Sequence, residues 1–128
     1  MESTWWKLLE DNTLVDVTSG NAFVMRLPDG TTMRVRVANI DDSASKDQLR
    51  ALLRGRKIEV WVVPALRYDR SVEGQVRAGT VDVANAMLAL GEARYVDATP
   101  YTISSYYACL NRIAEREAKA AHRGLWAY

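Results

Sequence analysis

Apolar and polar residues alternate strictly over residues 32–38, with Arg34 and Arg36 on one face of an extended segment and apolar side chains on the other. Such alternation is typical of an antiparallel strand with one buried face. A second apolar segment lies at residues 23–27, and residues 28–31 between the two contain Pro and Gly in an order that suits a tight turn. The pattern therefore predicts a β-hairpin made of these two segments.

The rest of the chain is predicted to contain three helices and two further strands. The helices are expected over residues 46–53, 82–90 and about 104–122, and the strands over residues 57–63 and 74–81. The inner face of the last helix is predicted to consist of Leu110, Ile113, Ala114, Ala118 and Ala121. Short antiparallel strands together with such helices indicate the α+β class, and a small closed or partly open barrel hides the strand edges.

Composition limits the classes of protein that remain. The chain has 128 residues, of which 48% are hydrophobic and 26% are charged, which suits one domain with its own core and argues against disorder. The single cysteine, Cys109, excludes an intramolecular disulfide framework, and the single histidine, His122, excludes a multi-histidine metal site. Cys109 is predicted to be a small buried side chain, and His122 to interact with the helix dipole at the end of the last helix.

The sequence carries no signal for a membrane or for secretion. No apolar run approaches the ~18 residues of a membrane helix, and the start of the chain lacks the basic segment and apolar core of a secretory leader. We therefore expect no membrane span and an intracellular location, in the cytoplasm or in an organelle matrix such as that of the mitochondrion.

Charge is balanced overall but uneven along the chain. The formal net charge is +1, and bases outnumber acids between residues 34 and 57. This basic segment is either an electrostatic contact for nucleic acid or another anion, or simply a solvated face.

Several short motifs occur in the order found in a known nuclease family. They lie at residues 17–24, 28–30, 36–41, 91–93 and 117–126, and the last one closes with Gly-Leu-Trp. On these motifs, the chain from about residue 13 to residue 126 resembles the staphylococcal nuclease (thermonuclease) family. The resemblance implies a five-stranded OB-fold barrel with about three helices, and active members of the family hydrolyse DNA and RNA with one Ca²⁺.

The resemblance also assigns the positions of the family's metal ligands. The first ligand, an aspartate in an Asp-Gly-Asp-Thr turn, corresponds to Asn21, and the second corresponds to Asp41. Asp42 occupies a position that contributes a backbone carbonyl in the family. Because an amide oxygen adds no charge and Ca²⁺ affinity depends on ligand charge, these residues are expected to be the remnant of a metal site.

The catalytic positions are also altered. The glutamate that the family uses as general base corresponds to Ala44, which accepts no proton, whereas the two phosphate-binding arginines correspond to Arg36 and Arg70. Loss of a general base typically lowers the rate by about 10²–10⁴. We therefore expect a catalytically inactive domain without a cofactor, which acts as a structural or protein-interaction subunit of a larger intracellular assembly.

Two alternatives stay open at this point. One is a weak Ca²⁺-dependent phosphodiesterase that uses the remnant positions, the only case in which a Ca²⁺ cofactor is expected. The other is an OB-fold domain that binds single-stranded nucleic acid with Arg34 and Arg36.

Aromatic residues provide candidate contacts with other protein subunits. We divide the chain into an N-terminal aromatic extension, residues 1–12, and a staphylococcal nuclease-like domain, residues 13–128. Trp and Tyr are the residues that most often anchor protein interfaces. The candidate contact residues are Trp5, Trp6, Tyr106 and Tyr107.

Overall fold

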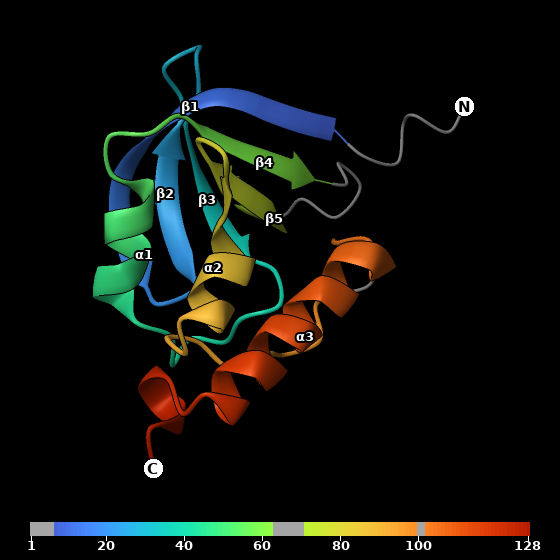
Figure 1. The fold of residues 1–128 in the computed structure, drawn as a ribbon. Coiled ribbons are helices and arrows are strands. Elements are labelled where there is room, and N and C mark those ends of the chain that lie inside the picture. Colours follow the sequence, from blue (N-terminus) through green and yellow to red (C-terminus); the bar gives the residue numbers. More distant parts are fainter. Residues whose placement is uncertain (1–6, 63–70, 100–101) are drawn as a thin grey trace.

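The computed structural model describes residues 7–62, 71–99 and 102–128 (Figure 1). Trp5, Trp6 and Arg70, three of the candidate residues, lie outside these ranges. Among the described helices, none has the length and apolar character that crossing a membrane requires.

Five strands form a closed barrel. They are β1 (Lys7–Ser19), β2 (Ala22–Arg26), β3 (Thr32–Val37), β4 (Ile58–Val62) and β5 (Ser71–Ala78). Neighbours follow the order β3-β2-β1-β4-β5, and a parallel pairing of β3 with β5 closes the ring. A two-residue strand, β6 (Val81–Asp82), pairs antiparallel with the end of β5. The structure confirms the predicted α+β class and the five-stranded barrel, which leaves its strands without long free edges.

The predicted hairpin is formed by β2 and β3. Met33, Val35 and Val37 are buried in the barrel, while Arg34 and Arg36 on the alternate positions are exposed. The strict alternation in the sequence therefore reports the inner and outer faces of the barrel wall.

Strand β1 is longer than the part of the chain that carries the motifs. It begins at Lys7, so it crosses the boundary expected between residues 12 and 13, and Lys7 pairs with Val62 of β4. The pairing with β4 is irregular between Leu9 and Asn12, where the buried Asn12 side chain donates to the carbonyls of Leu9 and Ile58. Residues 7–12 are thus part of the barrel wall.

All three predicted helices are present. They are α1 (Lys46–Leu53), α2 (Val83–Ala89) and α3 (Ser105–Ala120), and a short 3-10 helix, η3 (Gly124–Trp126), follows α3. The N-cap side chains of Ser45, Asp82 and Ser104 accept hydrogen bonds from backbone N–H groups of the first turns. Figure 1 shows α1 against one side of the barrel and α3 packed on α2 at one end of it.

The prediction for the inner face of α3 is correct only in part. Ala114 and Ala118 are buried, but Ile113 is 38% exposed and Ala121 is also exposed. The physical reason is that α3 packs on the seven-residue helix α2, which covers only a narrow stripe of small side chains. The prediction for Cys109 is wrong, since this residue is exposed on the opposite side of α3.

A chain of hydrogen-bonded amides, two of them buried, joins the end of β3 to both helices. Asn111 Nδ2 donates to Asn39 Oδ1 at 3.0 Å, and Asn85 Nδ2 donates to Asn111 Oδ1 at 3.2 Å. Asn39 Nδ2 donates in turn to the carbonyl of Val96. Asn39 and Asn111 are each 1% exposed, so these bonds fix the segment that follows β3 against α2 and α3.

Candidate functional site

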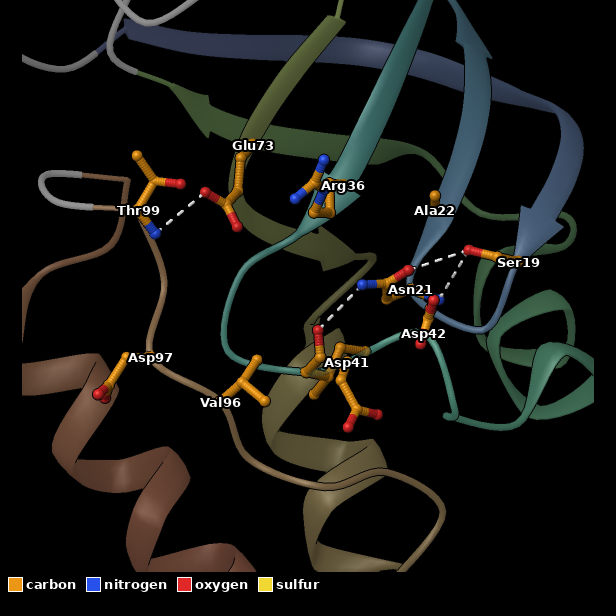
Figure 2. Close-up of a pocket in the computed structure, with 11 residues that line it drawn as sticks. Ser19, Asn21, Ala22, Arg36, Asp41, Asp42, Glu73, Val96, Asp97 and Thr99 are labelled. Atoms are coloured by element: carbon orange, nitrogen blue, oxygen red, sulfur yellow. Dashed lines mark hydrogen bonds between the residues drawn. The ribbon is translucent and has the colours of Figure 1, made fainter.

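A pocket of about 550 Å³ lies beside the turn between β1 and β2. Figure 2 shows that its wall also includes the end of β3, the start of β5 and the segment that leads to α3. The lining residues are Ser19, Asn21, Ala22, Arg36, Ile40, Asp41, Asp42, Glu73, Val96, Asp97 and Thr99. The fold therefore brings Asn21, Arg36, Asp41 and Asp42, four of the positions that the resemblance assigned, to one pocket.

Asn21 holds the β1–β2 turn against the segment after β3. Its Oδ1 accepts a hydrogen bond of 2.9 Å from the Ser19 hydroxyl, and its Nδ2 donates at 3.1 Å to the carbonyl of Ile40 (Figure 2). Both ends of the amide are engaged, so Asn21 has a structural role at this position.

Asp41 and Asp42 differ in their surroundings. One carboxylate oxygen of Asp41 accepts hydrogen bonds from both the backbone N–H and the hydroxyl of Ser43. The side chain of Asp41 is thereby held over the turn that follows it. Asp42 is exposed.

The donor set does not fit a calcium site. Ca²⁺ takes six to eight oxygen ligands, with several carboxylates in tight sites. Within the described ranges, no group of three or more His, Cys, Asp or Glu side chains is arranged to hold a metal ion. Asn21 offers a neutral amide oxygen in place of a carboxylate, and one of the two Asp41 carboxylate oxygens accepts the hydrogen bonds from Ser43.

Ala44 lies in the core and does not line the pocket. It is 6% exposed and belongs to the main hydrophobic cluster. Its carbonyl packs so closely on Gly20 that a Cβ there would overlap it, which explains the glycine in the β1–β2 turn. The position that corresponds to the family's general base therefore presents no polar group to the pocket.

Arg36 shares the pocket with a carboxylate that the sequence did not reveal. The parallel register of β3 and β5 pairs Arg36 with Glu73, and Glu73 Oε1 accepts a 3.2 Å hydrogen bond from the backbone N–H of Thr99 (Figure 2). The predicted strand over residues 74–81 began one residue too late to include Glu73, whereas β5 begins at Ser71. Only the parallel pairing brings this side chain to Arg36.

Helix α3 fixes the rim of the pocket through Tyr95. The Tyr95 hydroxyl accepts a 3.1 Å hydrogen bond from Arg112 and donates at 3.2 Å to Asp97. The hydrogen bond to Tyr95 raises the pKa of the Arg112 guanidinium. Asp97 is thus held beside the pocket as another negative charge.

Among the described residues, acidic side chains predominate in the lining of the pocket. Its described lining contains four carboxylates, from Asp41, Asp42, Glu73 and Asp97, and one guanidinium, from Arg36. Arg34 lies on the exposed face of β3 and does not line the pocket. A phosphodiester carries a negative charge, so the four described carboxylates repel it and Arg36 attracts it.

A second concave surface lies between α2 and α3, with a volume of about 330 Å³. Tyr107, Leu110 and Ile113 supply its apolar wall. Tyr106 and Tyr107 are 66% and 38% exposed, and their rings meet edge to face with centroids 5.2 Å apart. The described pair of candidate interface tyrosines is therefore accessible to a partner.

The comparisons with known proteins agree with the fold. No individual curated protein matches the sequence significantly. The sequence model described as "Staphylococcal nuclease homologue" matches residues 34–128. This match covers more than half of the chain and includes β3 from Arg34 onward, the segment after it and all three helices. The protein belongs to the staphylococcal nuclease homologue family.

Proposed function

We propose that this domain does not hydrolyse nucleic acids and acts as a structural subunit that binds another protein. Ala44 carries the first half of the proposal. Its methyl side chain is buried in the core and cannot take a proton from an attacking water. A longer acidic side chain there would have to leave the core to reach the pocket.

The charges around the pocket support the same proposal. Hydrolysis of a phosphodiester needs positive groups that stabilise charge on the reacting phosphate. In the described lining, Arg36 is the single cation and Glu73 is its neighbour on β5. The nearby carboxylate weakens the attraction of Arg36 for an anion.

The binding half of the proposal rests on the α2–α3 groove, by which we mean the concavity lined by Tyr107, Leu110 and Ile113 with Tyr106 at its edge. These side chains are fixed by a regular helix and leave apolar area uncovered. Rigid aromatic anchors of this kind contribute most of the free energy in many protein interfaces. Trp5 and Trp6, which precede β1 in the sequence, remain a second predicted contact.

Cleavage of fluorescently labelled single-stranded DNA and RNA tests the first half. Purified protein with verified fold is assayed with Ca²⁺ and with a chelator, beside an active nuclease as positive control. We expect no cleavage under either condition. Ca²⁺-dependent cleavage that is lost in Asp41→Ala and retained in Asp16→Ala, an exposed aspartate on β1, would replace the proposal with a weak nuclease.

Co-purification from the native cells tests the second half. We expect a defined set of proteins to accompany the tagged chain, and Tyr106→Ser with Tyr107→Ser to weaken that association by about tenfold or more. Tyr128→Ser, a change of the same type at a fully exposed position, is the matched control. Trp5→Ala with Trp6→Ala tests the predicted N-terminal contact separately. If neither pair of substitutions alters the set, these aromatic residues are not the interface.

A further inference from the structure

A basic hollow lies where α1 leads into β4. The consecutive residues Arg54, Gly55, Arg56 and Lys57 form one wall, Thr13 and Leu14 of β1 form the other, and the hollow measures about 360 Å³. We call this surface the basic hollow. Among the described residues, its lining contains three cationic side chains and no carboxylate.

The positive charge of the basic hollow is not neutralised by ion pairs. The two ion pairs found among the described residues lie elsewhere, on α1 and α3. The Arg56 guanidinium donates to the carbonyl of Leu52, which holds it at the end of α1. Arg26 pairs with Thr13 across β1 and β2 and adds a further cation beside the hollow. Its guanidinium is held by the neutral carbonyl of Gly30, so its charge also remains available to an anion.

The basic hollow lies far from the acidic pocket. Thr13 pairs with Arg26 near one end of the β1–β2 ladder, and Ser19 pairs with Ala22 at the other end, beside the pocket. Six residues of extended strand span about 20 Å. Figure 1 shows the α1–β4 connection at the end of the barrel opposite α3. The near-zero net charge of the chain therefore conceals two surfaces of opposite sign.

We propose that the basic hollow binds the phosphates of a single-stranded nucleic acid. Arginine and lysine side chains, together with the Thr13 hydroxyl, are the donors that contact phosphate oxygens in nucleic-acid complexes. A flexible single strand follows a charged groove through its backbone. A lipid surface is less suitable, because insertion requires exposed apolar side chains and Leu14, the single large apolar residue of the lining, is half-buried.

The basic hollow and the acidic pocket have opposite electrostatic effects on a single-stranded nucleic acid. The basic hollow attracts the phosphate backbone of the nucleic acid. The acidic pocket, about 20 Å away along β1, repels it. The bound strand is thereby kept from the positions that correspond to the family's catalytic residues. The inference concerns binding alone, so it stands or falls independently of the protein partner and of the cleavage assay.

Fluorescence anisotropy with labelled single-stranded DNA and RNA oligonucleotides, in the presence of chelator, tests the inference. The variant Arg54→Gln/Arg56→Gln/Lys57→Gln removes the three charges and retains side chains that can donate hydrogen bonds. The matched control, Lys7→Gln/Lys46→Gln/Arg116→Gln, removes the same charge from three exposed positions outside the hollow. Thermal unfolding verifies that both variants remain folded.

The expected effect follows from counterion release. For a single strand, three phosphate contacts give a slope of about −2 in a plot of log K against log salt concentration. Affinity therefore falls about a hundredfold when salt rises from 0.1 M to 1 M. We expect the hollow variant to lose at least about tenfold in affinity at 0.1 M salt and to show a shallower salt slope. The control variant should remain within about threefold of the parent.

Three results would overturn the inference. Equal losses in the two variants would mean that net charge alone drives binding. Equal affinity of the hollow variant and the parent, with the same salt slope, would place binding elsewhere, with Arg34 and Arg36 as the next positions to test. Tighter binding of the parent to phosphatidylserine vesicles than to oligonucleotides, lost in the hollow variant, would assign the basic hollow to a lipid surface.

Discussion

Replacement of Asn111 by alanine should destabilise the fold more than any other single truncation on α3. The Asn111 amide donates to Asn39 Oδ1 at 3.0 Å and accepts from Asn85 Nδ2 at 3.2 Å. Both Asn39 and Asn111 are 1% exposed. Water therefore cannot replace the lost partner without entering the contact between α3 and the segment after β3.

The cost can be estimated from the two bonds. Leaving Asn39 Oδ1 buried without a donor costs about 1–3 kcal/mol, and the second hydrogen bond contributes about 0.5–1.5 kcal/mol. Asn85 Nδ2 keeps its contact with the carbonyl of Leu110 at 3.3 Å, which limits the loss on that side. The expected decrease in the free energy of unfolding is about 2–4 kcal/mol, a large part of the ~5–15 kcal/mol of a typical domain.

Urea denaturation followed by tryptophan fluorescence measures this decrease, and thermal unfolding should show a Tm lower by roughly 10 °C. The control is Arg116→Ala, an exposed change on the same helix, which should alter stability by less than about 0.5 kcal/mol. Asn39→Gly removes the other amide while tolerating the left-handed backbone of that residue, whose φ is 73°. The double variant should cost less than the sum of the single variants, because the two side chains share a bond. Strict additivity, or a loss below about 0.5 kcal/mol for Asn111→Ala, would refute the role of the amide chain.

Two further predictions concern the backbone and the metal. Gly55 and Gly91 both have φ of 74°, but a Cβ on Gly91 would overlap the carbonyl of Arg123 while one on Gly55 meets open space. Both substitutions introduce the left-handed strain of about 1–2 kcal/mol. In urea denaturation, Gly91→Ala should therefore lower the free energy of unfolding by at least about 2 kcal/mol more than Gly55→Ala. Equal losses would contradict the close packing of Gly91 on Arg123. Added Ca²⁺ at millimolar concentration should leave Tm unchanged, because the donor set does not fit the ion; a reproducible rise of more than about 2 °C would show that the folded state binds it.

Local patterns predicted the elements well where the physical cause is local. Ser45 and Asp82 cap helices because their side chains reach backbone N–H groups three residues ahead. The alternation around Arg34 and Arg36 predicted the strand and its exposed face, since side chains of a strand point to opposite sides in turn. These features depend on neighbours within a few residues, and the predicted helices and hairpin are present in the structure.

Features that depend on packing between distant segments were missed or misassigned. Ile113 has the apolar character of a core residue, yet the narrow contact with α2 leaves it exposed, and the polar Asn111 takes the buried place. Cys109 faces away from α2 for the same reason. No local signal distinguishes these positions, because the width of the contact is set by the partner helix.

The sequence by itself determined the fold class, the hairpin, the helices, the family resemblance and the identities at the remnant positions, including the absence of a carboxylate at Ala44. Tertiary structure alone decided what surrounds those positions. Parallel pairing of β3 with β5 sets Glu73 beside Arg36. The connection from α1 to β4 lies against β1, which brings three cationic residues close to Thr13. Charges act through space, so the sign of each surface depends on which distant segments the closed barrel brings together.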